Sequence, residues 1–198
     1  MSNYIEHTQI KLKHMNTLID DNGELPLGAR LKLFEIEEEC RQEEKYFRRQ
    51  LFCKTECKCA FFTWHFWTDN ISETDPMDLL KLAISSNLSG DVQAKRGKLL
   101  TFLENKLYHG APFNAIYAGF SCWAAIGSLT IGISRAISNL TEKEIDPTEW
   151  MAAYHSSIAY AGKAIWEENP DNQKRKEFWL WYLNECIPES IKEIESEI

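Results

Sequence analysis

No Lys, Arg, Asp or Glu occurs between Lys106 and Arg135, and this uncharged stretch limits the possible folds more than any other part of the chain. On length alone it could cross a bilayer. Small and polar residues dilute it, however, at Asn114, Gly119, Ser121, Gly127, Ser128, Thr130 and Gly132. Because such a mixture is poorly suited to lipid, we expect no membrane span. A seam of small side chains also recurs at every fourth position, at Ala124, Ser128, Gly132 and Ala136. The stretch is therefore predicted to be a helix packed on all sides at the centre of the fold.

Every other long segment also has helical periodicity, and no convincing run alternates like a strand. The predicted helices are 29–52, 53–68, Asp75 to Ser89, 91–108, the uncharged stretch, 146–165 and the segment after Asp171. Segment 53–68 could instead be a short strand, but helix is favoured, and residues 1–28 have no readable pattern. Asp-Pro pairs at Asp75 and Asp146 mark two of the helix starts. The sequence thus predicts an all-α, compact helical domain, residues 1–198, with about seven helices around the central apolar helix.

Four large aromatic residues crowd the last predicted helix, at Phe178, Trp179, Trp181 and Tyr182. They could stack on bases, form a ridge for a partner, or lie in the core. On a helix they cover more than one face, which a surface helix does not need. Stacking on bases would need basic neighbours, whereas the following turns are acidic. We therefore predict that these rings belong to the core, with a partner ridge as the alternative.

Thirty acidic residues against 22 Lys and Arg give a formal net charge of -8. This charge repels phosphate backbones and favours basic partners, so we predict a protein partner and no direct nucleic-acid binding. The first residues contain no apolar run of signal-peptide length, which predicts a cytoplasmic protein. Its six cysteines are then expected to be reduced thiols.

Four potential soft metal ligands lie close together, at Cys53, Cys57, Cys59 and His65. Their spacing lacks the Cys-x2-Cys pair of common zinc sites. A helix would also place Cys57 and Cys59 about 200° apart, facing away from each other. We therefore predict no metal site and no cofactor. A cytosolic metal-binding or redox-responsive helical regulator built on these residues is kept as the alternative function.

No catalytic constellation is readable. Ser121 lies in Gly-Phe-Ser-Cys-Trp, which lacks the second glycine of a nucleophile elbow. The run His155-Ser156-Ser157 falls inside a predicted helix, where adjacent side chains face different directions. The carboxylates occur in solvated runs rather than in apolar pockets that would raise a carboxyl pKa. We therefore predict that the protein is not an enzyme.

Acidic residues gather in two places. Near the C-terminus they recur every four positions, at Glu185, Glu189, Glu193 and Glu197. A second group lies within residues 35–44. Such groups are either solvated faces or surfaces that steer a basic partner, and we weigh the two equally. The residues predicted to contact a partner are Glu35, Glu38, Glu39, Glu43, Glu189 and Glu193.

Segments 146–166 and 175–190 resemble the C-terminal signature of the fifth-named family of predicted immunity proteins from bacterial polymorphic toxin systems. The matching residues are Arg175, Phe178, Trp179, Trp181, Tyr182, Leu183, Glu185, Ile187 and Pro188. Cys186 departs from the pattern, since a small residue such as Ala is usual there. The resemblance implies an all-helical, cytosolic protein that binds and neutralises one cognate toxin domain, protecting the producing cell. It also implies that the signature marks the shared scaffold and that toxin specificity lies on surface outside it.

Overall fold

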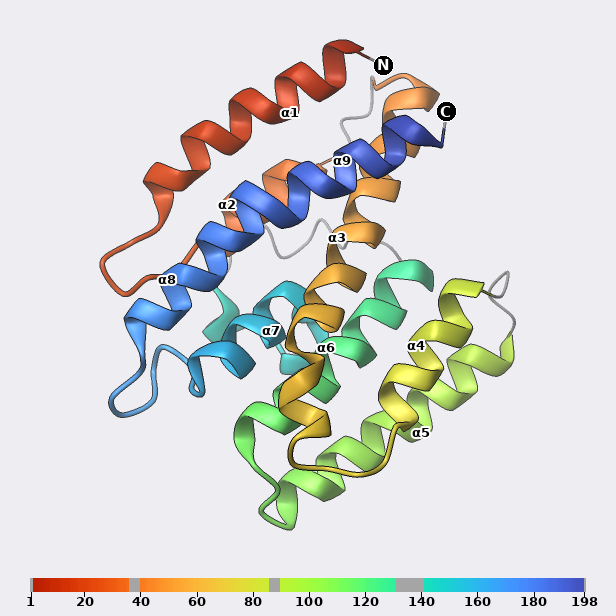
Figure 1. Cartoon of the computed structure of the whole chain (residues 1–198), viewed down its shortest axis with the longest axis vertical. Coiled ribbons are helices and arrows are strands. Elements are labelled where there is room, and N and C mark those ends of the chain that lie inside the picture. The colour runs from red at the N-terminus through yellow and green to blue at the C-terminus, as the bar shows by residue number, and fades with distance from the viewer. Residues whose placement is uncertain (1, 36–39, 86–89, 131–140, 198) are drawn as a thin grey trace.

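The computed structural model of the chain describes residues 2–35, 40–85, 90–130 and 141–197, and in these ranges it contains no β-strand. The α-helices are α1 (Ser2–Met15), α2 (Leu27–Phe34), α3 (Gln42–Thr68), α4 (Asp75–Ser85), α5 (Gly90–Tyr108), α6 (Phe113–Thr130), α7 (Ala152–Ala161), α8 (Asn172–Trp181) and α9 (Ile187–Ser196). A π-helical turn, Tyr182–Cys186, joins α8 to α9 into one continuous helix (Figure 1). The predicted all-α fold is confirmed, with eight helices in the described ranges when α8 and α9 are counted together.

Helix α6 lies at the centre of the fold, as its lack of charge predicts. It packs against α3, α4, α5 and α7. Seven of its residues have no exposed surface, namely Ala115, Ile116, Ala118, Ser121, Cys122, Ala125 and Ile126. Of the predicted small-residue seam, Ala124 and Ser128 are buried, while Gly132 and Ala136 lie outside the described residues. Within the ranges described, no helix has the length and apolarity needed to cross a membrane.

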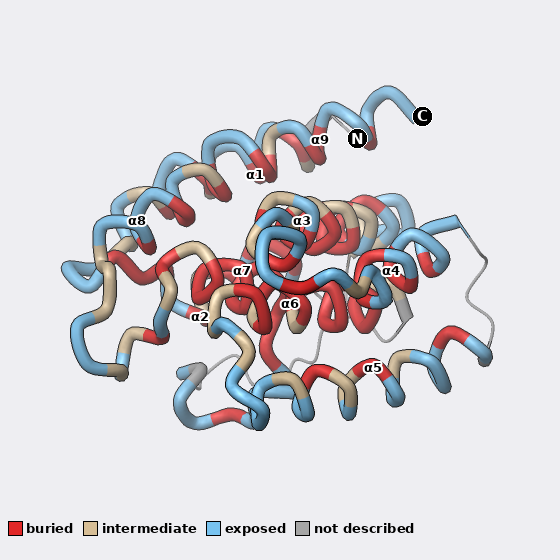
Figure 2. Tube along the Cα trace, turned by 60° about the horizontal axis from the view of Figure 1, so that its bottom comes forward, coloured by how far each residue is buried: buried red, intermediate tan, exposed pale blue. Residues whose placement is uncertain are grey.

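Helix α3 separates two hydrophobic clusters, which explains why its second half carries aromatic residues on every side. Phe47, Leu51 and Cys59 belong to the cluster shared with α1, α2, α8 and α9. Cys57 and Trp67 belong to the other cluster, shared with α4, α5 and α6. Figure 2 shows buried residues along the length of α3 between these layers. The helical interpretation of 53–68 is therefore confirmed.

The prediction of one helix over 29–52 is wrong, because this segment forms two helices. Helix α2 ends at Phe34, where Glu35 takes an extended conformation, and α3 begins at Gln42. Apolar residues of both helices belong to the same cluster. Arg48 of α3 then donates a hydrogen bond of 3.2 Å to the Leu33 carbonyl, one of the groups left without a partner at the end of α2.

The helix predicted over 146–165 is shorter than expected. Asp146-Pro147 opens only a 3₁₀ turn, in which the Asp146 carboxylate accepts a hydrogen bond from the Thr148 amide. Helix α7 starts at Ala152, whose amide donates to the buried Glu56 carboxylate at 2.5 Å. It ends at Gly162, which has a left-handed φ of 79°. The carboxylate that caps α7 thus comes from α3, a tertiary contact that no local signal reveals.

The aromatic group of the last helix lies in the core, as predicted. Phe178, Trp179 and Tyr182 have no exposed surface. Trp181 is half-buried and stacks on Phe62 of α3, with ring centroids 3.8 Å apart and planes 16° from parallel. These rings hold the C-terminal helix against α3. The N-terminal helix α1, which sequence reasoning missed, lies on the same side of α3 and contributes to the same cluster (Figure 1).

Besides Arg48, four charged residues are buried in this half of the molecule. Arg30 and Arg175 have no exposed surface, while Glu56 and Glu24 are 1% and 4% exposed. Arg175 pairs with Glu24 at 3.3 Å. Arg30 donates a hydrogen bond to the Leu25 carbonyl, and its guanidinium lies 4.9 Å from the ring centre of Trp179. Burial raises the pKa of Glu24 to about 7, although both arginines favour its ionised form.

Candidate partner-binding surfaces

The acidic face of α9 is held against two lysines of α3. Lys58 lies 3.2 Å from Glu189 and 2.8 Å from Glu193. Lys54 lies 3.7 Å from Glu193 and 2.8 Å from Glu197. The later lysine of α3 thus pairs with the earlier glutamates of the C-terminal segment, and the earlier lysine with the later ones. The two helices are therefore antiparallel. Glu189 and Glu193 thus keep 61% and 47% of their side chains exposed while each contacts a lysine.

These ion pairs reduce the negative charge that the sequence alone indicates for this face. Partial burial lowers the pKa of Lys58, but the hydrogen bonds that Lys58 donates to the carboxylates of Glu193 and Glu189 outweigh this effect and leave the pKa above its ordinary value. Lys58 is therefore charged at neutral pH. Sequence reasoning missed both lysines, although their i,i+4 spacing at 54 and 58 is a readable signal for one face of a helix.

The other predicted contact residues belong to the segment from Glu35 to Glu43, between the end of α2 and the first turn of α3. Glu35 directly follows α2 and Glu43 is in the first turn of α3, and both are exposed. Glu38 and Glu39 lie outside the described residues. Since α3 and α9 are antiparallel, the start of α3 and the end of α9 lie at the same end of the molecule (Figure 1). We call this region, with Glu35 and Glu43, the acidic end, whereas Glu189 and Glu193 lie beside Lys54 and Lys58, about 18–24 Å farther along α3.

The three clustered cysteines of α3 do not face a common point. Cys59 packs in one hydrophobic cluster and Cys57 in the other, while His65 is exposed. Burial raises the pKa of Cys53 to about 11 and that of Cys57 to about 12, which opposes the thiolate form that binds metals. Among the described residues, no group of three or more Cys, His, Asp or Glu is placed to hold a metal ion.

The hydroxyl and imidazole groups of α6 and α7 are buried packing groups. Ser156 donates a hydrogen bond of 2.9 Å to the Cys59 carbonyl and lies 2.7 Å from the hydroxyl of Ser121. His155 turns the other way and stacks on Phe120, with ring centroids 5.6 Å apart. The serines therefore link α3, α6 and α7, and the imidazole does not contact them in this arrangement. The predicted divergence of His155 and Ser156 is confirmed.

The burial of His155 predicts a specific pH dependence of stability. Burial lowers its pKa from 6.5 to about 3. As pH falls below 6.5, His155 becomes protonated in the unfolded chain but stays neutral in the folded chain. Protonation therefore favours the unfolded state, and the folded protein loses stability as pH falls from 6.5 towards 3. In the wild-type protein this effect should lower the free energy of unfolding by up to about 1.4 kcal/mol per pH unit, and we expect His155→Phe to abolish it. Urea unfolding of both proteins at pH 7.5, 6 and 5 measures the difference.

The buried glutamates do not obscure this comparison. The raised pKa values of Glu24 and Glu56 act in the opposite direction, since stability from such groups falls as pH rises from 4.5 towards 7. Both proteins share that contribution, so it cancels in their difference. A free-energy difference that stays constant from pH 7.5 to 5 would contradict the prediction.

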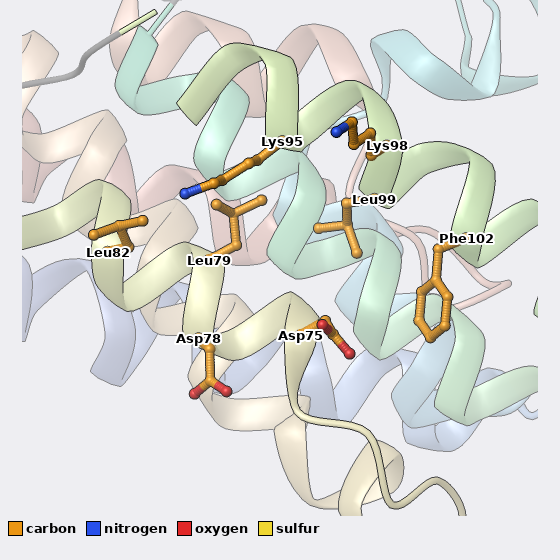
Figure 3. Close-up of a pocket in the computed structure, with 8 residues that line it drawn as sticks. All are labelled: Asp75, Asp78, Leu79, Leu82, Lys95, Lys98, Leu99 and Phe102. Carbon is orange, nitrogen blue, oxygen red and sulfur yellow. The ribbon is translucent and has the colours of Figure 1, made fainter. Parts of the chain in front are cut away.

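A groove of about 590 Å³ lies between α4 and α5, and sequence reasoning did not find it. Its lining residues are Asp75, Asp78, Leu79 and Leu82 from α4, and Lys95, Lys98, Leu99 and Phe102 from α5. Figure 3 shows the leucines of the two helices facing each other, with the aspartates and lysines around them. Leu82 is 40% exposed. The groove is therefore a second candidate surface, apolar at its floor and charged at its rims.

Both sets of lining residues follow one rule that the sequence contains. On each helix they occupy positions i, i+3, i+4 and i+7, which form a single face. The sequence predicts one such face on each helix. It does not reveal that the two faces line a shared groove, because each could equally be covered by another helix of the fold. That outcome depends on how α4 and α5 pack on α6.

Comparison with protein families gives one match. The family described as immunity protein Imm5 matches residues 10–189, which includes every described helix in whole or in part. A comparison with curated proteins gives no match. The family match covers Glu35, Glu43 and Glu189, the α4–α5 groove and the aromatic core of the C-terminal helix, and it ends before Glu193.

Proposed function

The chain belongs to the Imm5 family of immunity proteins, and on this premise we propose that it binds one cognate toxin domain and neutralises it in a stoichiometric complex. Family membership makes it an immunity protein directed against a toxin, a role that needs no catalysis by the protein itself. The family match over residues 10–189 is the observation that carries the proposal. Neutralisation then consists of covering the toxin's active site or holding it inactive.

The charge of the chain supports a basic toxin domain, such as a nuclease. At -8 the protein attracts a positively charged surface and repels nucleic acid, so it meets the toxin rather than the toxin's substrate. We place this encounter in the cytoplasm of the producing cell, within a polymorphic toxin system used in bacterial competition. Long-range attraction raises the association rate, while a few desolvated contacts supply most of the affinity.

The predicted contact residues enter this proposal as the steering surface. Glu35, Glu38, Glu39 and Glu43 would guide the toxin by charge. Glu189 and Glu193 already contact Lys54 and Lys58, so part of their charge is compensated. They would contribute less to steering than Glu35, Glu38, Glu39 and Glu43. The cysteines give no comparable support to a metal-binding or redox-responsive regulator.

On this proposal, we expect the reading frame immediately upstream of this chain to encode the toxin domain, and the test uses that domain purified in a catalytically inactive form. We expect a one-to-one complex that forms more slowly as salt concentration rises. Replacing Glu35 and Glu43 together by Lys should slow association on the order of 10-fold at low salt and reduce its salt dependence. Stopped-flow or surface-binding kinetics at several salt concentrations measure both effects.

Glu104→Lys is the matched control, because Glu104 is an exposed acid on α5, away from the acidic end (Figure 1). It raises the net charge by 2, against 4 for the Glu35/Glu43 variant, so position matters if the Glu35/Glu43 variant lowers the logarithm of the association rate by more than twice as much. Unchanged association by the Glu35/Glu43 variant would remove these residues from the steering surface. Absence of any complex between the wild-type protein and the toxin domain would overturn the proposed function.

A further inference from the structure

We infer that the α4–α5 groove is the docking site for an amphipathic helix of the toxin domain. The inference rests on the proposed function and deepens it, since it names the kind of toxin segment that is bound and where. It is carried by the geometry of the lining residues, by the exposed apolar surface at the groove and by the charges on its rims.

The geometry favours a helix as the occupant. Each of the two helices presents a complete i, i+3, i+4, i+7 face to the groove, from Asp75 to Leu82 on α4 and from Lys95 to Phe102 on α5. Such faces are the ones by which helices pack against helices, through ridges that fit into grooves. Helices α4 and α5 pack on each other and on α6, and Leu79 and Leu99 at the base of the groove belong to the hydrophobic cluster that these helices share. A third helix laid between them would meet both faces at once, as in helix-in-groove recognition.

The apolar floor is not fully used within the chain. Leu79 and Leu99 at its centre are 9% and 5% exposed, whereas Leu82 is 40% exposed and Phe102 is partly exposed. Leu82 and Phe102 therefore keep surface that another apolar side chain can cover. Figure 3 places them at opposite ends of the groove, with Leu79 and Leu99 between them. An occupant with an apolar ridge several residues long would contact all four.

The rims carry opposite charges that do not pair across the groove. Asp75 and Asp78 lie on the α4 side, and Lys95 and Lys98 on the α5 side. Lys95 pairs with Asp91 of its own helix at 2.7 Å, and Asp78 accepts a hydrogen bond from the hydroxyl of Thr74. Among these eight described lining residues, no ion pair joins α4 to α5.

Charge complementarity therefore sets the chemistry of the occupant. It should carry basic side chains along the edge beside Asp75 and Asp78, and acidic side chains beside Lys95 and Lys98. A basic toxin offers the first edge readily. The two unlike rims also restrict the helix to one direction in the groove, because reversing it would bring like charges together.

The experiment compares two leucines of α4 and α5 that are almost equally exposed. Leu82 is in the groove and 40% exposed, while Leu107 is 37% exposed and does not line it. With the inactive upstream toxin domain as the probe, Leu82→Glu should weaken binding at least about 10-fold, and Leu107→Glu should stay within about 2-fold of wild type. Asp78→Lys should also weaken binding, and thermal melts identify any variant that fails to fold.

Hydrogen exchange on the wild-type complex gives an independent readout. Docking in the groove predicts added protection in residues 79–82 and 95–102. If wild-type protein binds the toxin domain but Leu82→Glu and Asp78→Lys both bind normally, or added protection is confined to other segments, the groove assignment is overturned and the proposed function stands. If the wild-type protein forms no complex, the proposed function itself fails.

Discussion

Replacing Arg175 by Met is expected to destabilise the folded protein by about 3–5 kcal/mol, because it leaves a buried carboxylate without its partner. Arg175 has no exposed surface and pairs with Glu24, which is itself 5% exposed at its side chain. It also donates hydrogen bonds to the hydroxyl of Ser157 and the carbonyl of Lys163. The guanidinium thus joins the α1–α2 connection, α7 and the segment after α7 to the C-terminal helix. Urea unfolding at pH 8 measures the loss.

The loss should depend on pH, because Glu24 can take up a proton. Burial raises the pKa of Glu24 to about 7, and Arg175 opposes that rise. Without Arg175 the pKa of Glu24 rises further, so the carboxyl is neutral at pH 5 and ionised only at higher pH. Arg175→Met should therefore be less destabilised at pH 5 than at pH 8.

Two variants control for this interpretation. Lys174→Met changes the neighbouring residue, whose side chain is 57% exposed, and should alter stability by less than about 0.5 kcal/mol. Glu24→Gln combined with Arg175→Met removes both charges and should recover part of the loss. Equal losses for the single and the double variant, at both pH values, would show that the Glu24 pair is not the cause.

Arg175 also shows how far sequence reasoning reaches. In the sequence it is one of three adjacent basic residues, 174–176, which are most simply interpreted as solvated. Yet Arg175, Phe178, Trp179 and Tyr182 follow helical spacing on one side of α8, and all four are buried. The spacing was readable. The charge of the buried Arg175 is compensated by Glu24, which comes from a distant part of the chain and which the local spacing does not indicate.

The fold class was predictable because helical periodicity is a local property. The uncharged stretch indicated the central α6, and helix start signals located α4 and the C-terminal helix. The errors arose where a tertiary contact sets a helix end. Arg48 binds the end of α2, and the Glu56 carboxylate from α3 binds the start of α7. The sequence analysis missed both helix ends, and it predicted one unbroken helix over 29–52 and too long a helix over 146–165.

The candidate surfaces divide in the same way. The exposed state of Glu35, Glu43, Glu189 and Glu193 agrees with their local pattern. The closeness of Glu35 to the start of α3 follows only from the packing of α2 on α3, and the presence of Lys54 and Lys58 beneath the α9 glutamates follows only from the antiparallel packing of α3 and α9. The α4–α5 groove likewise needs two helix faces to be brought together, which periodicity within one segment cannot indicate.

Replacing Gly23 by Ala is expected to destabilise the protein by more than about 2 kcal/mol, since two separate costs combine there. Gly23 has a φ of 74°, which disfavours any residue with a Cβ. A Cβ at this position would also collide with the Asn172 carbonyl oxygen and lie 3.0 Å from the Lys176 amide nitrogen, both in the backbone of α8. Backbone atoms of a helix cannot turn aside as a side chain can.

The collision would act on the same contact that Arg175 stabilises. The Asp20 side chain accepts hydrogen bonds from the amides of Asn22 and Glu24, both at 2.9 Å, and so holds the turn that contains Gly23. Moving this turn away from α8 would carry Glu24 away from Arg175. We therefore expect the loss in Gly23→Ala to include part of the loss in Arg175→Met, so the two changes together should cost less than their sum.

Gly110 provides the control, because it has nearly the same backbone conformation without the collision. Its φ is 79°, and a Cβ there would meet no atom within 4 Å. Gly110→Ala should therefore cost only the conformational part, about 1–2 kcal/mol. Thermal or urea unfolding of the two variants separates the effects. If Gly23→Ala and Gly110→Ala lose the same stability, the turn at residues 20–24 can move away from α8 at no measurable cost. The close backbone contact would then not help to fix the C-terminal helix.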